Sequence, residues 1–406
     1  MKHKNTFLTS IFLTAFLDML GVGIIIPIIP ALFYTKHLSY FSNLGDANTI
    51  RWTFCLLMAS FSFMQFFGAP ILGALSDRIG RKKVIQIALI GTAVGYALFG
   101  IALSSHSLFL LFLSRIIPGF FGGSLSVLFS SISDVSSPED KPKNFALVGI
   151  AFALGFIFGP LIGGFLSDKS IVSWFTLSTP FILATILALL NFVFVHFFYQ
   201  ETLSVKKDTK ISFFKGFTNL HKAFTNTNLR ILFTITFLNT LGFSFFTQFF
   251  SVFMYNKFHV SQKTVGLIFG WVGICLIFSQ GFLVRKVSKK YQPHVIINYT
   301  MVLMGTFILC LIFPKNIEGI LLCNFLIAMT QGLNSPNLLS IVSKQASQAD
   351  QGETMGINQS MQSLAQFAPP IFVGFFGENL NNIPFIFGGL SIVLGWFVFA
   401  FLFNKK

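Results

Sequence analysis

The sequence alternates long apolar stretches with short polar connections. A helix that crosses the hydrocarbon core of a bilayer needs about 20 mainly apolar residues. Twelve crossings would return the chain to the side of the membrane on which it started. We therefore predict an all-α integral membrane protein with twelve transmembrane helices, at residues 7–33, 52–75, 84–103, 107–132, 144–166, 176–199, 229–255, 264–284, 293–313, 317–342, 354–377 and 382–403.

The positively charged residues indicate which side carries the termini. Of the 28 Lys and Arg residues, 21 lie near the two ends and in alternate loops, 6 lie in the other loops, and Arg115 lies inside a span. Positively charged loops remain in the cytoplasm. We therefore expect the protein in a cell membrane, with both termini in the cytoplasm.

The composition excludes a soluble protein. Hydrophobic residues make up 54% of the chain and charged residues 10%, against roughly 25% charged residues in a soluble domain. The net charge of +15 comes mainly from the loops, so it indicates topology and contact with anionic lipid rather than nucleic acid. The four cysteines are far apart and form no CxxC pair or His/Cys cluster, so we expect no disulfide and no metal site.

The two halves of the chain are similar to each other. The longest connection, 201–228, separates residues 1–200 from residues 229–406. A duplicated six-helix unit predicts two pseudo-symmetric bundles with a cavity between them near the bilayer midplane, opened to alternate sides by rocking. Three pairs of segments align at separations of 208 to 210 residues: 73–83 with 281–291, 138–140 with 348–350, and 159–160 with 368–369.

The polar loop after the second span is a candidate gate on the cytoplasmic side. Asp77 could face the positive N-terminus of the eleventh helix, near Gly352. Arg78 or Arg81 could pair with Asp134 at the end of the fourth helix. The alternative is a merely basic loop. The gate candidates are Gly73, Asp77, Arg78, Gly80, Arg81 and Asp134.

Two charged residues lie deep inside apolar spans, where an ionisable group is costly and indicates function. At 1.5 Å per residue, Asp18 lies roughly 16 Å from the cytoplasmic boundary, and Arg115 roughly 12 Å from the opposite one. In a core about 30 Å thick the two reach a similar depth. We expect Asp18 to bind the proton and Arg115 to tune it; the alternative is a fixed structural ion pair.

The fifth span carries glycines at Gly155, Gly159 and Gly163, which share one helix face. Small residues allow helices to approach closely in lipid. Helix eight offers a matching face at Gly266, Gly270 and Gly273, although plain packing without functional consequence is the alternative. The full motif comprises Gly149, Gly155, Gly159, Pro160, Gly163 and Gly164.

Amide side chains inside the C-terminal spans are candidates for substrate binding. Amides bind ligands of varied charge, but they also bridge helices. Their concentration in the C-terminal half indicates that selectivity resides there. The candidates are Asn239, Gln248, Gln331, Asn334, Asn358 and Gln362.

Several of these motifs resemble those of a known family. GALSDRIGRKK at 73–83 resembles the loop hallmark of the major facilitator superfamily. LDMLGVGIIIP at 17–27 is similar to the first helix of tetracycline-efflux-like, twelve-helix drug:proton antiporters. RIIPG at 115–119, GIAFALGFIFGPLIGG at 149–164 and YQETL at 199–203 resemble their arginine motif, their antiporter motif and their exit from helix six. The resemblance implies exchange of protons for amphipathic drugs or metabolites, with the helix-five contact sealing the periplasmic side. Because these exporters are bacterial, it also implies a location in the bacterial inner membrane.

The sequence departs from the tetracycline exporters in two places. Gly95 stands where those exporters carry an acidic residue in helix three, and the ninth span, 295–313, contains no acid. A cationic metal–tetracycline chelate would lose both partners, so we do not expect tetracycline as the substrate.

The sequence thus predicts a monomeric multidrug-efflux-like secondary antiporter rather than an enzyme. It should need no cofactor, because the proton gradient supplies the energy and no GxxxxGK[ST] nucleotide motif occurs. Its partners would be protons, a small molecule and the lipid bilayer. The alternatives are a proton-coupled importer of a nutrient or siderophore, and a non-transporting membrane sensor or enzyme.

Overall fold

The structure is a computed structural model of the 406-residue chain. It describes residues 2–25, 28–34, 45–167, 171–203, 227–260, 262–347, 350–376 and 382–403. Most of the expected central loop falls on residues 204–226, which lie outside this described part.

The N-terminal half of the described chain is helical, and its helices follow the predicted spans closely. The first predicted span is divided into α1 and α2, and the fourth into α5 and α6. The helices are α1 (Lys2–Ile25), α2 (Ile28–Tyr34), α3 (Ala47–Ile79), α4 (Arg81–Ser104), α5 (Leu108–Gly122), α6 (Leu125–Val135), α7 (Lys141–Leu166) and α8 (Thr179–Phe198).

The C-terminal half repeats this pattern with one irregularity. The eighth span contains a π-helical turn, η1, between two α-helical pieces. The elements are α10 (Thr227–Phe258), α11 (Gln262–Phe278), η1 (Ser279–Leu283), α12 (Val284–Val287), α13 (Pro293–Cys310), α14 (Ile317–Lys344), α15 (Gln351–Phe376), α16 (Ile383–Val398) and the π-helical η3 (Phe399–Phe403).

Eleven helices among the described residues are long and apolar enough to cross a bilayer. The remaining predicted span, the eleventh, is α15, a helix of 26 residues that is more polar than the others. Its polar residues Asn358, Gln359 and Ser360 are buried inside the protein. The helix therefore does not present these polar groups to lipid, which would leave them without hydrogen-bond partners.

Helix ends follow from local sequence. Asp46 caps α3 by accepting a hydrogen bond from the backbone N–H of Thr49 at 2.9 Å, as N-cap residues do. Between α3 and α4, Gly80 has φ +105°, a left-handed conformation that glycine adopts without a steric penalty. Prolines occupy the first turn of α7, α8, α13 and α16, where a missing N–H does no harm.

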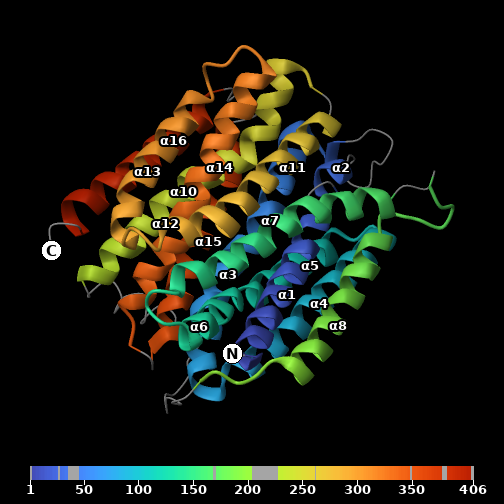
Figure 1. Cartoon of the computed structure of the whole chain (residues 1–406). Helices are drawn as coiled ribbons and strands as arrows, with labels where there is room; N and C mark the ends of the chain where they lie inside the picture. Colours follow the sequence, from blue (N-terminus) through green and yellow to red (C-terminus); the bar gives the residue numbers. More distant parts are fainter. Residues whose placement is uncertain are drawn as a thin grey trace.

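The helices form two groups that lie side by side. Figure 1 shows α1 to α8 (blue to green) on one side and α10 to α16 (yellow to red) on the other, with both chain ends at the end of the bundle opposite α2. The halves meet along α3 and α15. Their contact extends from Gly73 beside Gly352 at one end to the rings of Trp52 and Phe375, 5.0 Å apart, at the other.

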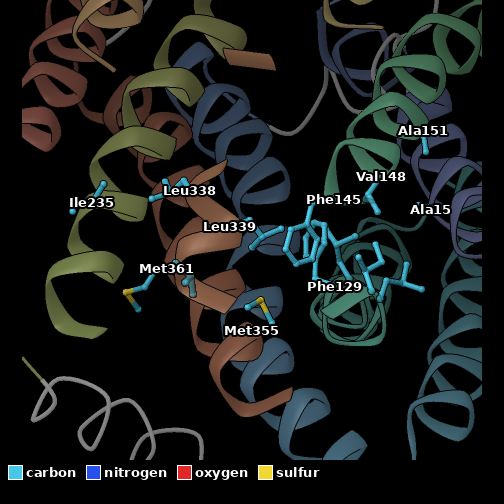
Figure 2. Close-up of a cluster of buried hydrophobic side chains, with 14 of the residues drawn as sticks. Ala15, Phe129, Phe145, Val148, Ala151, Ile235, Leu338, Leu339, Met355 and Met361 are labelled. Carbon is cyan, nitrogen blue, oxygen red and sulfur yellow. The ribbon is translucent and has the colours of Figure 1, made fainter. Parts of the chain in front are cut away.

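A continuous apolar core joins the two groups. Its buried residues come from both halves, including Ala15 of α1, Val148 of α7, Leu338 of α14 and Met361 of α15, and Figure 2 shows them converging between the helices. The outward faces are also apolar, with Phe109, among many others, 70% exposed. A protein that is apolar both inside and outside is suited to lipid as its solvent.

Candidate functional site

The glycine face of α7 packs against α1. A Cβ added at Gly159 would lie 2.5 Å from Cα of Gly23, and one added at Gly155 would lie 2.6 Å from Cβ of Met19. Gly163 faces Ile24 in the same way. The expectation that helix eight receives this face is therefore wrong. Because Gly23 supplies a backbone-only surface on α1, the two helices approach more closely than side chains would permit.

The remaining residues of the helix-five motif have separate surroundings. Gly273 of α11 contacts the side chain of Ile157, whereas an added Cβ at Gly266 or Gly270 would meet no atom within 4 Å. Gly149 faces the side chain of Gln280 in η1, across the two halves, and Pro160 packs near Gly23. Gly164 is exposed, and a Cβ there would meet nothing within 4 Å.

The α1–α7 contact determines where Asp18 lies. Asp18 directly precedes Met19, which packs against Gly155. The side chain of Asp18 is half-buried, and it forms no hydrogen bond or ion pair with any residue that the structure describes. Tyr96 of α4 lies beside it, because the Tyr96 ring and hydroxyl pack directly against Gly21, one turn further along α1.

Arg115 of α5 is buried and forms no ion pair with an acid that the structure describes. Its guanidinium lies over the ring of Phe61, 4.7 Å from the centroid, in a cation–π contact. Its Nε has no hydrogen-bond partner in the described structure. Asp18 and Arg115 do not form the ion pair that was considered as an alternative. Instead, Tyr96 lies within electrostatic range of both charges, and sequence reasoning missed it because nothing in the sequence marks a lone tyrosine as central.

The absence of an acid from the third predicted span, α4, has a steric basis. A Cβ at Gly95 would lie 2.5 Å from the ring carbons of Pro118 in α5. No side chain fits there unless α4 and α5 move apart. Glycine rather than an acid at position 95 therefore allows α4 and α5 to pack closely.

The gate candidates form a hydrogen-bonded cluster at the end of the bundle that carries the chain termini. Asp77 accepts hydrogen bonds from the backbone N–H groups of Gly352 at 3.0 Å and Glu353 at 2.9 Å, as expected for a carboxylate at a helix N-terminus. Arg81 donates to Asp77 at 2.6 Å and to Asp134 at 3.1 Å. Both contacts considered for this loop are thus present, with Arg81 rather than Arg78 as the cation, because Arg78 is exposed.

Two further residues complete this cluster. Glu201, after α8, accepts hydrogen bonds from the backbone N–H groups of Arg81 at 2.9 Å and Lys82 at 3.3 Å. Ser76 accepts one from Arg81 at 2.5 Å. We call Ser76, Asp77, Arg81, Asp134 and Glu201 the Asp77 cluster. The sequence had indicated Glu201 only through its resemblance to a family motif.

Tyr199, which directly follows α8, lies within electrostatic range of Arg81, Asp134 and Glu201 of the cluster. Its hydroxyl donates to Ser131 at 2.5 Å. Burial raises the pKa of the Tyr199 hydroxyl above its ordinary value, so it remains protonated and continues to act as a donor.

The candidate substrate amides fall into two groups. Asn334 donates to Asn239 at 2.8 Å and accepts from Thr300, and Asn358 accepts from Thr236 at 3.0 Å. These three buried amides bridge α10, α13, α14 and α15, so helix bridging occupies them here. Gln248 is exposed, and Gln331 and Gln362 are half-buried. Gln280 was missed: it is buried, and its Oε1 has no partner in the described structure.

This arrangement defines a class of protein: a membrane transporter built from two six-helix halves, with unpaired charges inside one half and a polar cluster joining both halves at one end. A sequence profile of the Major Facilitator Superfamily matches residues 11–370 and 232–406. The chain belongs to this superfamily. It is a multi-pass membrane transporter and not an enzyme.

Its relatives include drug-resistance proteins. The chain is 27% identical to the class C tetracycline resistance protein of Escherichia coli, over 92% of this chain and 90% of the relative. It is 28% identical to the quinolone resistance protein NorA of Staphylococcus aureus, over 90% and 88%. The crystal structure of the human organic anion transporter MFSD10 shares the fold, with a TM-score of 0.83 and 22% identity over 97% and 99% of the two chains.

The contact between α1 and α7 can be tested with a pair of matched variants. Gly159→Val should lower the free energy of unfolding by about 1–3 kcal/mol, because the new side chain must force α1 away from α7. Thermal unfolding of the purified protein in detergent measures this. Gly164→Val, in the same helix but with open space around it, should leave the melting temperature unchanged. Equal effects of the two variants would contradict the close contact.

The Asp77 cluster can be tested by measuring how far apart the two halves lie at this end. Spin labels at the exposed positions Glu139 and Gln345 report that distance in a cysteine-free background. Asp77→Asn should increase the longer-distance population about tenfold, because it removes the charged acceptor that binds the backbone N–H groups at the start of α15. Arg78→Gln, which changes the charge of an exposed residue nearby, should have no effect. An unchanged distribution in Asp77→Asn would show that the cluster does not hold the halves together.

Proposed function

We propose that this protein is a proton-coupled antiporter that exports amphipathic small molecules, drugs or metabolites, by alternating access between its two halves. The observation that carries this proposal is the carboxylate of Asp18 inside α1, which has no partner among the described residues and lies beside Tyr96. Tyr96 is also within electrostatic range of the buried Arg115, which has no acidic partner among the described residues. The similarity to tetracycline and quinolone resistance proteins supports export of such molecules.

An unpaired carboxylate suits the binding of a transported proton. An ionisable group inside a membrane is costly unless it is paired or performs a function. A fixed ion pair between Asp18 and Arg115 would hold both groups charged, and the structure contains no such pair. Asp18 can therefore exchange a proton without breaking a hydrogen bond to a neighbouring side chain. Each exchange changes the charge that Tyr96 experiences, and Tyr96 in turn interacts with Arg115, which couples proton binding to the packing of α1, α4 and α5.

The substrate is expected to be amphipathic, with the half-buried amides Gln331 and Gln362 and the exposed Gln248 as candidate contacts. A metal–tetracycline chelate is not expected. Gly95 packs against Pro118 and leaves no room for an acidic side chain, and α13 contains no acid. Asp18 is a carboxylate deep inside a described span of the N-terminal half, and a cationic substrate would compete with the proton there.

The Asp77 cluster serves in this proposal as the cytoplasmic gate. The cluster lies at the end of the bundle that carries the termini, which the distribution of basic residues assigns to the cytoplasm. With Asp77 bonded to the start of α15, this end is closed. Rocking of the halves must break the bonds of Asp77 to Gly352 and Glu353 before the substrate can enter from the cytoplasm.

The proposal is tested in inverted membrane vesicles that are energised and loaded with a pH-sensitive fluorescent probe. Cationic, neutral and anionic amphipathic compounds are added in turn. The wild-type protein should release protons from the vesicle interior on addition of one compound class. Asp18→Asn should abolish this release at every pH, because the amide cannot bind or release a proton, whereas Glu139→Gln, at an exposed acid, should retain it.

Persistent proton-driven transport by Asp18→Asn would remove Asp18 from the coupling path. A proton response that appears only when the gradient drives substrate in the opposite direction, in right-side-out vesicles, would support the nutrient or siderophore importer. Binding of a compound without any proton movement would support a non-transporting sensor.

A further inference from the structure

Four buried polar side chains meet where α6, α7, α14 and α15 begin or end. Ser133 and Ser343 lie 2.6 Å apart through their hydroxyls, and Lys141 donates to the Ser343 hydroxyl at 2.6 Å. Ser343 donates to Gln351 at 3.3 Å, and Gln351 donates back to the Ser343 carbonyl at 2.9 Å. A hydroxyl has one hydrogen and two acceptor positions. With Ser133 and Lys141 as donors and Gln351 as acceptor, the Ser343 hydroxyl uses all of them.

These four residues form two pairs of mates, that is, residues at equivalent positions in the two duplicated halves. Ser343 follows Ser133 by 343 − 133 = 210 residues, and Gln351 follows Lys141 by 351 − 141 = 210 residues, the separation that also relates Asp140 to Asp350. Lys141 and Gln351 are each the first residue of their helix. In a duplicated fold, mates lie on opposite sides of the pseudo-twofold axis. A direct contact between mates therefore lies on that axis.

An apolar layer of mates lies one helical turn further into the protein. Phe129 and Leu339 are 210 residues apart, as are Phe145 and Met355, and all four are buried. The rings of Phe129 and Phe145 lie 5.9 Å apart, and Figure 2 shows the four side chains gathered between helices of the two halves. This layer keeps water away from the polar quartet on its inner side, which strengthens the hydrogen bonds there.

The quartet is asymmetric in charge. Lys141 carries an ammonium where its mate Gln351 is neutral, and it forms no ion pair with the residues that the structure describes. Asp134 attracts the ammonium and Lys344 repels it. The Ser343 hydroxyl is thus its hydrogen-bonded partner. Removing an acceptor from a buried charge costs more than removing both partners together, because the charge is left unsatisfied.

We propose that Ser133, Lys141, Ser343 and Gln351 form a latch on the pseudo-twofold axis that holds this end of the two halves together. We call these four residues the axial latch. It joins α6 and α7 to α14, whereas the Asp77 cluster joins α3 to α15, so the two devices close the same end through different helices. The Ser133–Ser343 and Lys141–Ser343 contacts break together when this end opens. This inference rests on the alternating access of the proposed function, but its test does not use transport.

The test uses the spin-label pair at Glu139 and Gln345. Ser343→Ala should increase the ratio of long to short distances about tenfold, because it leaves the Lys141 ammonium buried without its acceptor. Ser340→Ala is the matched control. Ser340 lies one turn earlier in α14 and is fully buried, but its hydroxyl has no partner in the described structure. It should leave the distance distribution unchanged.

A double variant tests the contact itself. Lys141→Met removes the buried charge, so Lys141→Met with Ser343→Ala should open this end less than Ser343→Ala alone. Additive effects, or equal distributions for Ser343→Ala and Ser340→Ala, would overturn the latch. If Ser343→Ala does not fold, Ser133→Ala can be used instead. This change removes the hydrogen bond between Ser133 and Ser343 but leaves Lys141 bonded to Ser343, so it should give a smaller shift in the same direction. An intact distance response in a protein that does not move protons would contradict only the proposed function.

Discussion

The structure depends on one constraint: in a hydrocarbon solvent, each polar group inside a span must find its partner within the protein. The consequence is clearest in α15. This helix carries more amides and hydroxyls than the other spans and is less apolar than they are, yet it crosses the protein beside α3. Ser360 donates to the carbonyl of Phe66 at 2.6 Å, and Ser363 donates to Gln65 at 2.9 Å. The polar residues of α15 therefore form the seam between the two halves.

Because of the same constraint, a polar group inside a span that has no partner is a candidate for a functional role. Most buried polar side chains are hydrogen-bonded, as in proteins generally. Among the groups without a partner in the described structure, which occur in both halves, are the half-buried Asp18 and the Nε of Arg115. They are held in place by close backbone contacts, Gly23 against Gly159 on one side and Gly95 against Pro118 on the other. Close glycine contacts thus position the helices that carry Asp18 and Arg115, while no hydrogen bond within the described structure holds Asp18 in one protonation state.

Duplication explains why the two halves meet so closely at one end. A duplicated chain brings mates together on its axis, and the Ser133–Ser343 pair uses this property in its simplest form. Sequence differences between the halves then make the contacts between them asymmetric in charge. Asp77 has no acidic mate, since Arg285 stands in the corresponding loop, and Lys141 has a neutral one. In these contacts between the halves, the charged side chains Asp77 and Lys141 come from the N-terminal half, and the C-terminal half supplies a helix N-terminus and a hydroxyl to receive them.

The sequence by itself determined the membrane spans, the two halves, and the residue types of the gate. The length of an apolar stretch is a local property of the sequence, so the predicted span boundaries differ from the helix boundaries in the structure by only a few residues. The contact of Asp77 with the start of α15 was also predictable, because helix N-termini attract carboxylates wherever they occur. Only the tertiary structure decided which faces meet. It placed the glycines of α7 against α1 instead of α11, and Tyr96 within electrostatic range of both Asp18 and Arg115. It also brought together two serines 210 residues apart. Helical periodicity shows which residues share a face, but the partner of that face depends on how twelve helices fit together.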